Sequence, residues 1–162
     1  MELIEKKNIF EILNESLNKR NKTLTDVMDN YIDACHFLHS LETEYSFDFT
    51  DASVNLFLFA KDKYAVRWLV NAGADINNGW ESGITALSYA VYDRDEDLIY
   101  TFLEEGAKPN KKFLEELGRL YSPSFVECIL PFLDEKDMEY IISIRKRFPE
   151  NMQEFLYSLK IK

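Results

Sequence analysis

The chain has 162 residues, a net charge of −10 at pH 7 and a hydrophobic content of 46%. This length suffices for one domain with a buried core. The acidic balance disfavours nucleic acid as a ligand, because phosphate binding needs an excess of Lys and Arg. The longest unbroken apolar run, Leu56 to Ala60, is too short to span a membrane, so we also expect no membrane partner. No phosphate-cradling glycine loop occurs, and we expect no cofactor.

The negative charge is concentrated in the first two-thirds of the chain. Residues 1–50 and 51–110 each carry ten acidic and five basic side chains, whereas residues 111–162 carry nine of each. Such a field is compatible with attraction to a basic protein surface. A general role in keeping the protein soluble explains the acidity equally well.

The first fifty residues predict two amphipathic helices joined by a short polar loop. Within residues 3–18 one helical face carries the apolar side chains Ile9, Phe10, Leu13 and Leu17. Thr23 or Thr25 offers an N-cap for a second helix, whose apolar stripe extends to Leu41. We interpret this helical hairpin as a cap or degenerate repeat.

Residues 42–72 contain aromatic side chains that we assign to the core. Tyr45, Phe47 and Phe49 alternate along a short segment, which is either extended or a linker that places its rings against the core. Thr50 or Asp51 is then expected to cap a helix through Ala60. After a turn at residues 61–63, a second helix is predicted from about residue 64 to 72, with Trp68 as a core side chain.

A sequence repeat follows that second helix. The segment Gly73-Ala74-Asp75-Ile76-Asn77 is echoed 33 residues later by Gly106-Ala107-Lys108-Pro109-Asn110. Each copy follows an apolar run with helical spacing. We expect both glycines to end a helix in the left-handed conformation, which glycine adopts at the least cost. Thr85 is positioned as the N-cap of the helix between the two copies.

These residues resemble the ankyrin-repeat family. The segment Gly83-Ile84-Thr85-Ala86-Leu87-Ser88-Tyr89-Ala90 is similar to the family's helix start, with Ala86 in place of Pro and Ser88 in place of His. The resemblance is clear for about residues 65–110 and implies paired helices that stack side by side. It also implies a rigid concave platform that binds other proteins and has no chemistry of its own.

The loop from Asn77 to Gly83 is the most informative loop for binding. Its Asn78-Gly79 pair favours a tight turn with positive φ. The resemblance implies that this loop is a projecting finger beside the binding face. Trp80 then either anchors a partner, as Trp often does in interfaces, or folds back onto its own hairpin. The family's variable binding positions correspond here to Glu81, Ser82, Ile84, Tyr92 and Asp93, with Trp80 beside them.

The last third of the chain predicts further helices without a glycine finger. Helical apolar spacing occurs at residues 111–121, 125–133, 134–147 and 150–159. Pro131 should kink or shorten the helix in which it lies. The basic cluster Arg145-Lys146-Arg147 is expected at a helix C-terminus, where cations complement the helix dipole. We interpret residues 111–162 as a degenerate repeat followed by a helical cap.

Two groups of residues superficially resemble metal sites. Asp93, Asp95, Asp97 and Glu104 have the spacing of a calcium loop, but Leu98 occupies the position that requires glycine. Cys35, His36 and His39 lie close together, yet no second ligand pair with zinc spacing exists. We therefore expect no metal site, and we expect Cys35 and Cys128 to be buried thiols in a reducing compartment.

The sequence as a whole predicts an all-α fold: a short ankyrin-like solenoid with helical N- and C-terminal caps. We expect one domain of residues 1–162, divided into a cap or degenerate repeat (1–50), ankyrin-like repeats (51–110), and a degenerate repeat with a cap (111–162). Residues 1–7 carry charges where a secretory signal would be apolar, so a cytoplasmic location is expected.

The predicted function is non-enzymatic protein binding. The specific hypothesis is a small intracellular immunity or inhibitor protein that neutralises a basic toxin or nuclease. The first alternative is a secreted effector or viral host-range protein that recruits a host factor. The second is an enzyme with an unrecognised carboxylate site, because any acidic chain offers candidate carboxylates. The oligomeric state is left open.

Overall fold

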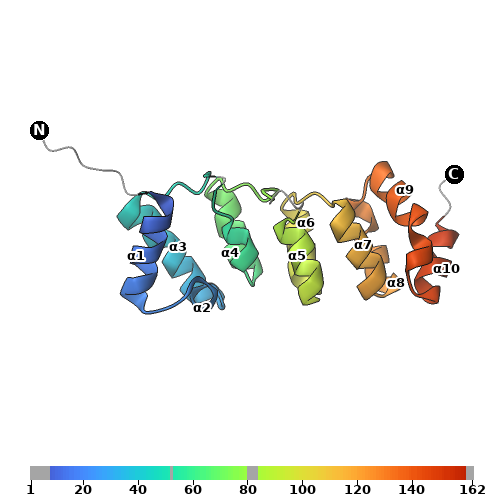
Figure 1. Ribbon diagram of the computed structural model, residues 1–162, viewed down its shortest axis with the longest axis horizontal. Coiled ribbons are helices and arrows are strands. Elements are labelled where there is room, and N and C mark those ends of the chain that lie inside the picture. The colour runs from blue at the N-terminus through green and yellow to red at the C-terminus, as the bar shows by residue number, and fades with distance from the viewer. Residues whose placement is uncertain (1–7, 52, 80–83, 160–162) are drawn as a thin grey trace, which may run out of the picture. The chain divides into compact units, whose positions relative to one another are not determined.

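The computed structural model describes residues 8–51, 53–79 and 84–159, and its regular structure there is entirely helical (Figure 1). The chain forms two compact units, Met1–Asp75 (unit 1) and Ile76–Lys162 (unit 2), and we describe each by itself. None of the helices in the described ranges is both long enough and apolar enough to cross a bilayer. The expected all-α class is confirmed.

Unit 1 begins with helix α1 (Ile9–Arg20), whose start is fixed by a reciprocal capping box between Asn8 and Glu11. The second helix predicted after Thr23 is interrupted. Thr23 caps only the short α2 (Leu24–Val27), and Asn30 caps a new helix, α3 (Tyr31–Tyr45), by accepting a hydrogen bond from the Asp33 amide. A second strong N-cap residue therefore divides what apolar periodicity alone shows as one helix.

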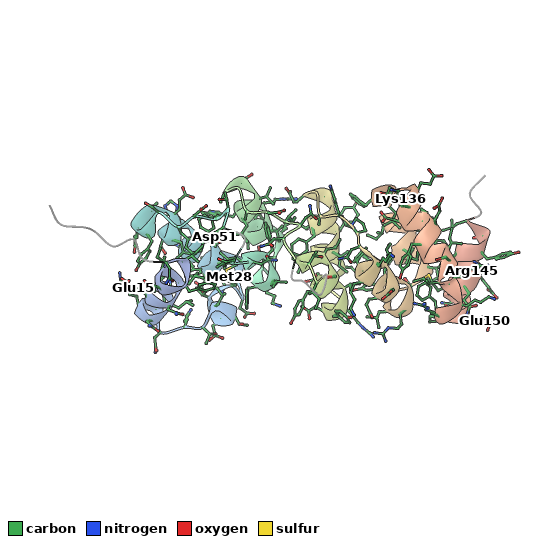
Figure 2. All side chains as sticks on the ribbon, turned by 45° about the horizontal axis from the view of Figure 1, so that its top comes forward. Glu15, Met28, Asp51, Lys136, Arg145 and Glu150 are labelled. Atoms are coloured by element: carbon green, nitrogen blue, oxygen red, sulfur yellow. The ribbon has the colours of Figure 1, made fainter. Side chains whose placement is uncertain are left out.

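The core of unit 1 lies between α1, α3 and the later helix α4 (Lys63–Asn71). Met28, labelled in Figure 2, is fully buried. The other fully buried large side chains of unit 1 are Phe37, Leu38, Leu41 and Leu69. On α1 the prediction was wrong for Phe10, which is 54% exposed, whereas Leu13 is buried. A polar bridge joins α1 to α3, because the Arg20 guanidinium donates to the hydroxyls of Ser16 (3.1 Å) and Ser40 (2.9 Å).

The segment between α3 and α4 contains the aromatic core residues. Phe47 and Phe49 are buried, as expected, and Trp68 packs edge-on against Phe49 with ring centroids 5.1 Å apart. Tyr45 instead belongs to the last turn of α3. The extended interpretation of residues 42–50 therefore fails for its first part.

The helix predicted from residue 50 to Ala60 was wrong. Among the residues of this stretch that the structure describes, the helical structure is a 3₁₀ turn, η1 (Leu56–Phe59). Three acidic or amide side chains each accept a hydrogen bond from the backbone two residues ahead: Asp48 from Thr50, Asp51 from Ser53, and Asn55 from Phe57. These local turns compete with helix formation, because they satisfy backbone donors before a helix can.

Unit 2 contains three successive helix pairs. They are α5 (Ala86–Asp93) with α6 (Glu96–Glu104), α7 (Lys111–Leu120) with α8 (Pro123–Ile129), and α9 (Glu135–Ser143) with α10 (Glu150–Ser158). The first helices of the pairs pack in series, α5 against α7 and α7 against α9, and α8 packs against α10. The 3₁₀ turns η2 (Leu130–Phe132) and η3 (Arg145–Arg147) follow α8 and α9.

Both repeat glycines adopt the expected left-handed conformation. Gly73 follows α4 with φ 92°, and Gly106 follows α6 with φ 98°. Each of these helix ends has the same two hydrogen bonds. The glycine amide donates to the carbonyl of the residue three positions earlier, and the amide of the next alanine donates to the carbonyl of the residue five positions earlier. The two copies therefore share one local geometry, in which the left-handed residue satisfies carbonyls that the helix leaves free.

The turn predicted at Asn78-Gly79 differs from the expectation. Neither residue has a positive φ. Gly79 instead approaches the segment just before α5 so closely that an added Cβ would lie 3.3 Å from the Ile84 carbonyl oxygen. Glycine is therefore suited to this position by the space available and not by backbone conformation.

Asn77, the last residue of the first repeat copy, bonds to the second copy within unit 2. Its side-chain amide donates to the Gly106 carbonyl (3.3 Å), and its Oδ1 accepts from the Lys108 amide (2.7 Å). Asn110 holds the corresponding position in the second copy, yet it caps α7 by accepting from the Phe113 amide (2.9 Å). The chain enters α7 only a few residues after Gly106, so the second copy leads directly into a helix.

The C-terminal helices lie at the predicted positions, and each ends earlier than predicted. The helix containing Pro131 ends as α8 at Ile129 and tightens into η2, as expected for a proline that lacks an amide donor. Ser122 caps this helix, and Pro123 occupies its first turn. The helix predicted to reach Arg147 ends at Ser143, and the basic cluster forms η3.

Gly118 permits the close approach of Phe148 to α7. A Cβ at position 118 would lie 2.3 Å from two atoms of the Phe148 ring, which is itself buried. We expect Gly118→Ala to lower the free energy of unfolding by about 1–3 kcal/mol, because overpacking outweighs the higher helix propensity of alanine. Urea denaturation measures the change.

A second substitution supplies the control for this prediction. In Gly118→Ala combined with Phe148→Leu, the smaller side chain makes room for the added methyl group. The double variant should lose less stability than the two single changes added together. Stability of Gly118→Ala at or above that of the original chain would contradict the proposed packing.

Candidate functional site

The predicted binding residues divide between described and undescribed parts of the chain. Trp80, Glu81 and Ser82 lie outside the described residues. Ile84 is half-buried immediately before α5. Tyr92 and Asp93 are exposed in the last turn of α5, and 43% of the Tyr92 surface is accessible. The structure therefore places two of the predicted residues together on one exposed helical turn.

The sequence of α5 determines which of its residues face outward. Thr85 and Ser88 form a capping box, in which the Thr85 hydroxyl accepts from the Ser88 amide (3.2 Å) and Ser88 Oγ accepts from the Thr85 amide (2.7 Å). The helix is buried on the sides that pack against α6 and α7. Its buried residues are Ala86, Leu87, Ser88, Ala90 and Val91.

Tyr89 belongs to the same exposed face, although it is not among the residues that the sequence predicts for binding. Its ring is 46% exposed, and it precedes Tyr92 by three residues on α5. Residues three apart on a helix are neighbours, with about 5–6 Å between their Cβ atoms. The spacing of the two tyrosines between buried positions was the signal that could have identified the pair. We call Tyr89, Tyr92 and Asp93 the α5 face.

Acidic side chains crowd the turn that joins α5 to α6. Arg94 adopts the left-handed conformation with φ 55°, and Asp95 caps α6 by accepting from the Leu98 amide (3.0 Å). Glu96 and Asp97 follow in the first turn of α6, where carboxylates are favourable toward the helix dipole. Residues 93–97 therefore form the end of α5, the turn and the start of α6.

Tyr121 links the C-terminal part of α5 to the α7–α8 pair. Its hydroxyl donates to the Val91 carbonyl (2.9 Å), and its ring packs against Phe125 with centroids 4.9 Å apart. Burial, reinforced by the negative charge of Glu96, raises the pKa of the Tyr121 hydroxyl to about 12. The hydroxyl therefore remains a hydrogen-bond donor at every physiological pH.

Within the described ranges no three His, Cys, Asp or Glu side chains are arranged to hold a metal ion. The expectation of buried thiols was wrong for Cys128, which is exposed, and holds only in part for Cys35, which is half-buried. Burial, and then the negative charge of Asp62, raise the pKa of the Cys35 thiol.

The basic cluster near the end of unit 2 is partly engaged by the fold. Arg145 donates to the Ile142 carbonyl (2.9 Å) near the end of α9, which agrees with the predicted role at a helix C-terminus. Its guanidinium also lies over the Tyr157 ring, 5.5 Å from the centroid, beside α10 (Figure 2). On the neighbouring helices, Tyr140 donates to Glu115 (2.5 Å).

Comparison with known proteins identifies no relative: no family model, no curated protein and no solved structure matches the chain.

The link between Tyr121 and Val91 generates a prediction for alkaline solution. Tyr121→Phe should lower the free energy of unfolding at pH 7 by about 1 kcal/mol, because a partly buried carbonyl loses its donor. The pKa of Tyr121 is higher in the folded state than in the unfolded chain, so protonated Tyr121 contributes its full stabilisation below about pH 10. This contribution disappears as the pH rises through about 12. The stability difference between the two proteins should therefore narrow over that interval, as chemical denaturation at several pH values would measure.

Tyr92→Phe is the matched control for loss of a hydroxyl, because its ring is exposed in the same unit. Its stability at pH 7 should stay within about 0.5 kcal/mol of the original chain. A constant difference between the original chain and Tyr121→Phe up to pH 12 would show that the Tyr121 hydroxyl is not held as described.

Proposed function

We propose that this chain is a non-enzymatic, ankyrin-like protein that binds another protein through the α5 face. The observation that carries the proposal is the exposure of Tyr89 and Tyr92 on a helix whose other apolar side chains are buried. Large exposed aromatic rings side by side are costly to hydrate, and aromatic residues are enriched at protein interfaces.

The ankyrin-like interpretation is supported by local geometry in both units. Gly73 and Gly106 end their helices with the same hydrogen bonds, and Thr85 caps α5 as the family pattern implies. In unit 2 the first helices of successive pairs pack in series, as they would in a repeat array. The short entry into α7 departs from the family pattern, which supports the interpretation of residues 111–162 as degenerate.

The α5 face is suited to a rigid interface. It is held by the capping box at one end of α5 and by the hydrogen bond from Tyr121 at the other. A surface that is ordered before binding loses less conformational entropy when the complex forms. Trp80, Glu81, Ser82 and Ile84 remain proposed contributors from the loop that precedes α5.

The charge of the chain favours a partner with a basic surface. Asp93, Glu96 and Asp97 lie at the turn beside the two tyrosines, and the first 110 residues carry most of the negative charge. Complementary charge accelerates association and selects among partners. A small acidic protein of this kind is suited to occlude a basic toxin or nuclease, and we propose an inhibitor or immunity role in the cytoplasm.

The direct test begins with cross-linking in the producing cell to identify the partner, followed by calorimetry with the purified pair. Tyr92→Ala should weaken binding by about 30-fold, corresponding to about 2 kcal/mol for an anchor residue. Its melting temperature should hardly change, because the ring is exposed. Raising the salt concentration from about 0.05 M to about 0.5 M should also weaken binding. If the partner is a nuclease, the complex should be inactive.

Tyr157→Ala supplies the control, because this exposed tyrosine lies on α10, away from the acidic turn in the sequence. It should change the affinity less than about twofold. Equal losses of stability and binding in Tyr92→Ala would assign this residue to the core. Acidic or neutral partners that bind independently of salt would overturn the electrostatic part of the proposal.

A further inference from the structure

The exposed tyrosines of the described chain differ in what covers their rings. A lysine or arginine lies over the ring of Tyr64 (Lys63, 5.2 Å) and of Tyr157 (Arg145, 5.5 Å). Tyr100 instead packs edge-on against Phe132, with centroids 5.3 Å apart. Tyr89 and Tyr92 have neither a cation nor a second aromatic ring against them among the residues that the structure describes.

The surroundings of these two rings favour a cation from outside the chain. Asp93 follows Tyr92 directly, and Glu96 and Asp97 are exposed at the start of α6. Arg94 is the one basic residue in this stretch, and it does not lie over either ring. The negative faces of tyrosine rings attract cations, and nearby carboxylates raise the local concentration of cations while repelling anions.

Arginine fits this surface better than lysine. The guanidinium group is planar and weakly hydrated, so it stacks on an aromatic ring and still donates to a carboxylate. An ammonium group is compact and strongly hydrated, so it gains less from the same contact. Two rings three residues apart on one helix can take one guanidinium between them or one on each ring.

We propose that Tyr89 and Tyr92 receive arginine side chains from a basic segment of the partner protein, with the carboxylates of the α5–α6 turn beside them. This inference rests on the proposed protein-binding function and adds the chemistry of the contact. The α5 face therefore prefers arginine to lysine side chains and does not respond to positive charge alone. A partner in which lysine replaces arginine at the contact would bind more weakly at the same net charge.

The test uses hexa-arginine and hexa-lysine peptides as probes of equal charge. Each is titrated into the ¹⁵N-labelled full-length chain, and the backbone amides of Tyr89 and Tyr92 report local binding by nuclear magnetic resonance. Hexa-arginine should bind at these amides at least about threefold more tightly than hexa-lysine. In Tyr89→Ala combined with Tyr92→Ala, the amides at the same positions should show this preference reduced to less than about 1.5-fold, whereas Tyr157→Ala should leave it unchanged.

Glu96→Gln combined with Asp97→Asn separates charge from stacking. This variant should weaken both peptides by a similar factor and keep the preference for arginine. Equal affinities of the two peptides at the α5 face would overturn the inference, as would an arginine preference that survives loss of both tyrosines. In either case the proposed protein-binding function would still be decided separately, by calorimetry with the purified partner protein.

Discussion

The structure of unit 2 depends on the burial of α5 between two other helices. Leu87 and Val91 are within 1% of complete burial, and Ala86 and Ala90 bring the α5 backbone close to α6 and α7. A helix that is packed on two sides has only one strip left for solvent. Tyr89 lies on that strip because its neighbours in the sequence are committed to the core. The α5 face is therefore a consequence of core packing.

The elements that could be predicted from the sequence are those fixed by local interactions. Gly73, Thr85 and Gly106 act through their own backbone and the adjacent turn, so their roles followed from residue type and position. The helix predicted at residues 50–60 failed for a related reason. The side chains of Asp48 and Asp51 accept hydrogen bonds from nearby backbone amides and so form local turns that compete with a helix. The apolar pattern of the sequence does not report this competition.

The candidate site could be predicted only in part, because exposure depends on which neighbours a helix acquires. Tyr92 and Asp93 were predicted from their positions in the repeat pattern, whereas Tyr89 lies in the segment that resembles the family's helix start and was not assigned to the surface. The hydrogen bond from Tyr121 to Val91 could not be predicted either, because it joins residues thirty positions apart in the sequence. Phe10 illustrates the opposite error, because apolar character on a helix does not ensure a partner.

Cross-saturation of the labelled chain bound to its purified protein partner shows most directly whether the α5 face is the binding surface. This experiment identifies the amides that lie against the partner without changing any residue. Signal loss should be centred on residues 84–97 and should be strongest on the outward side of α5. Signal loss centred on α9 and α10, or confined to unit 1, would contradict the claim that the α5 face is the binding surface.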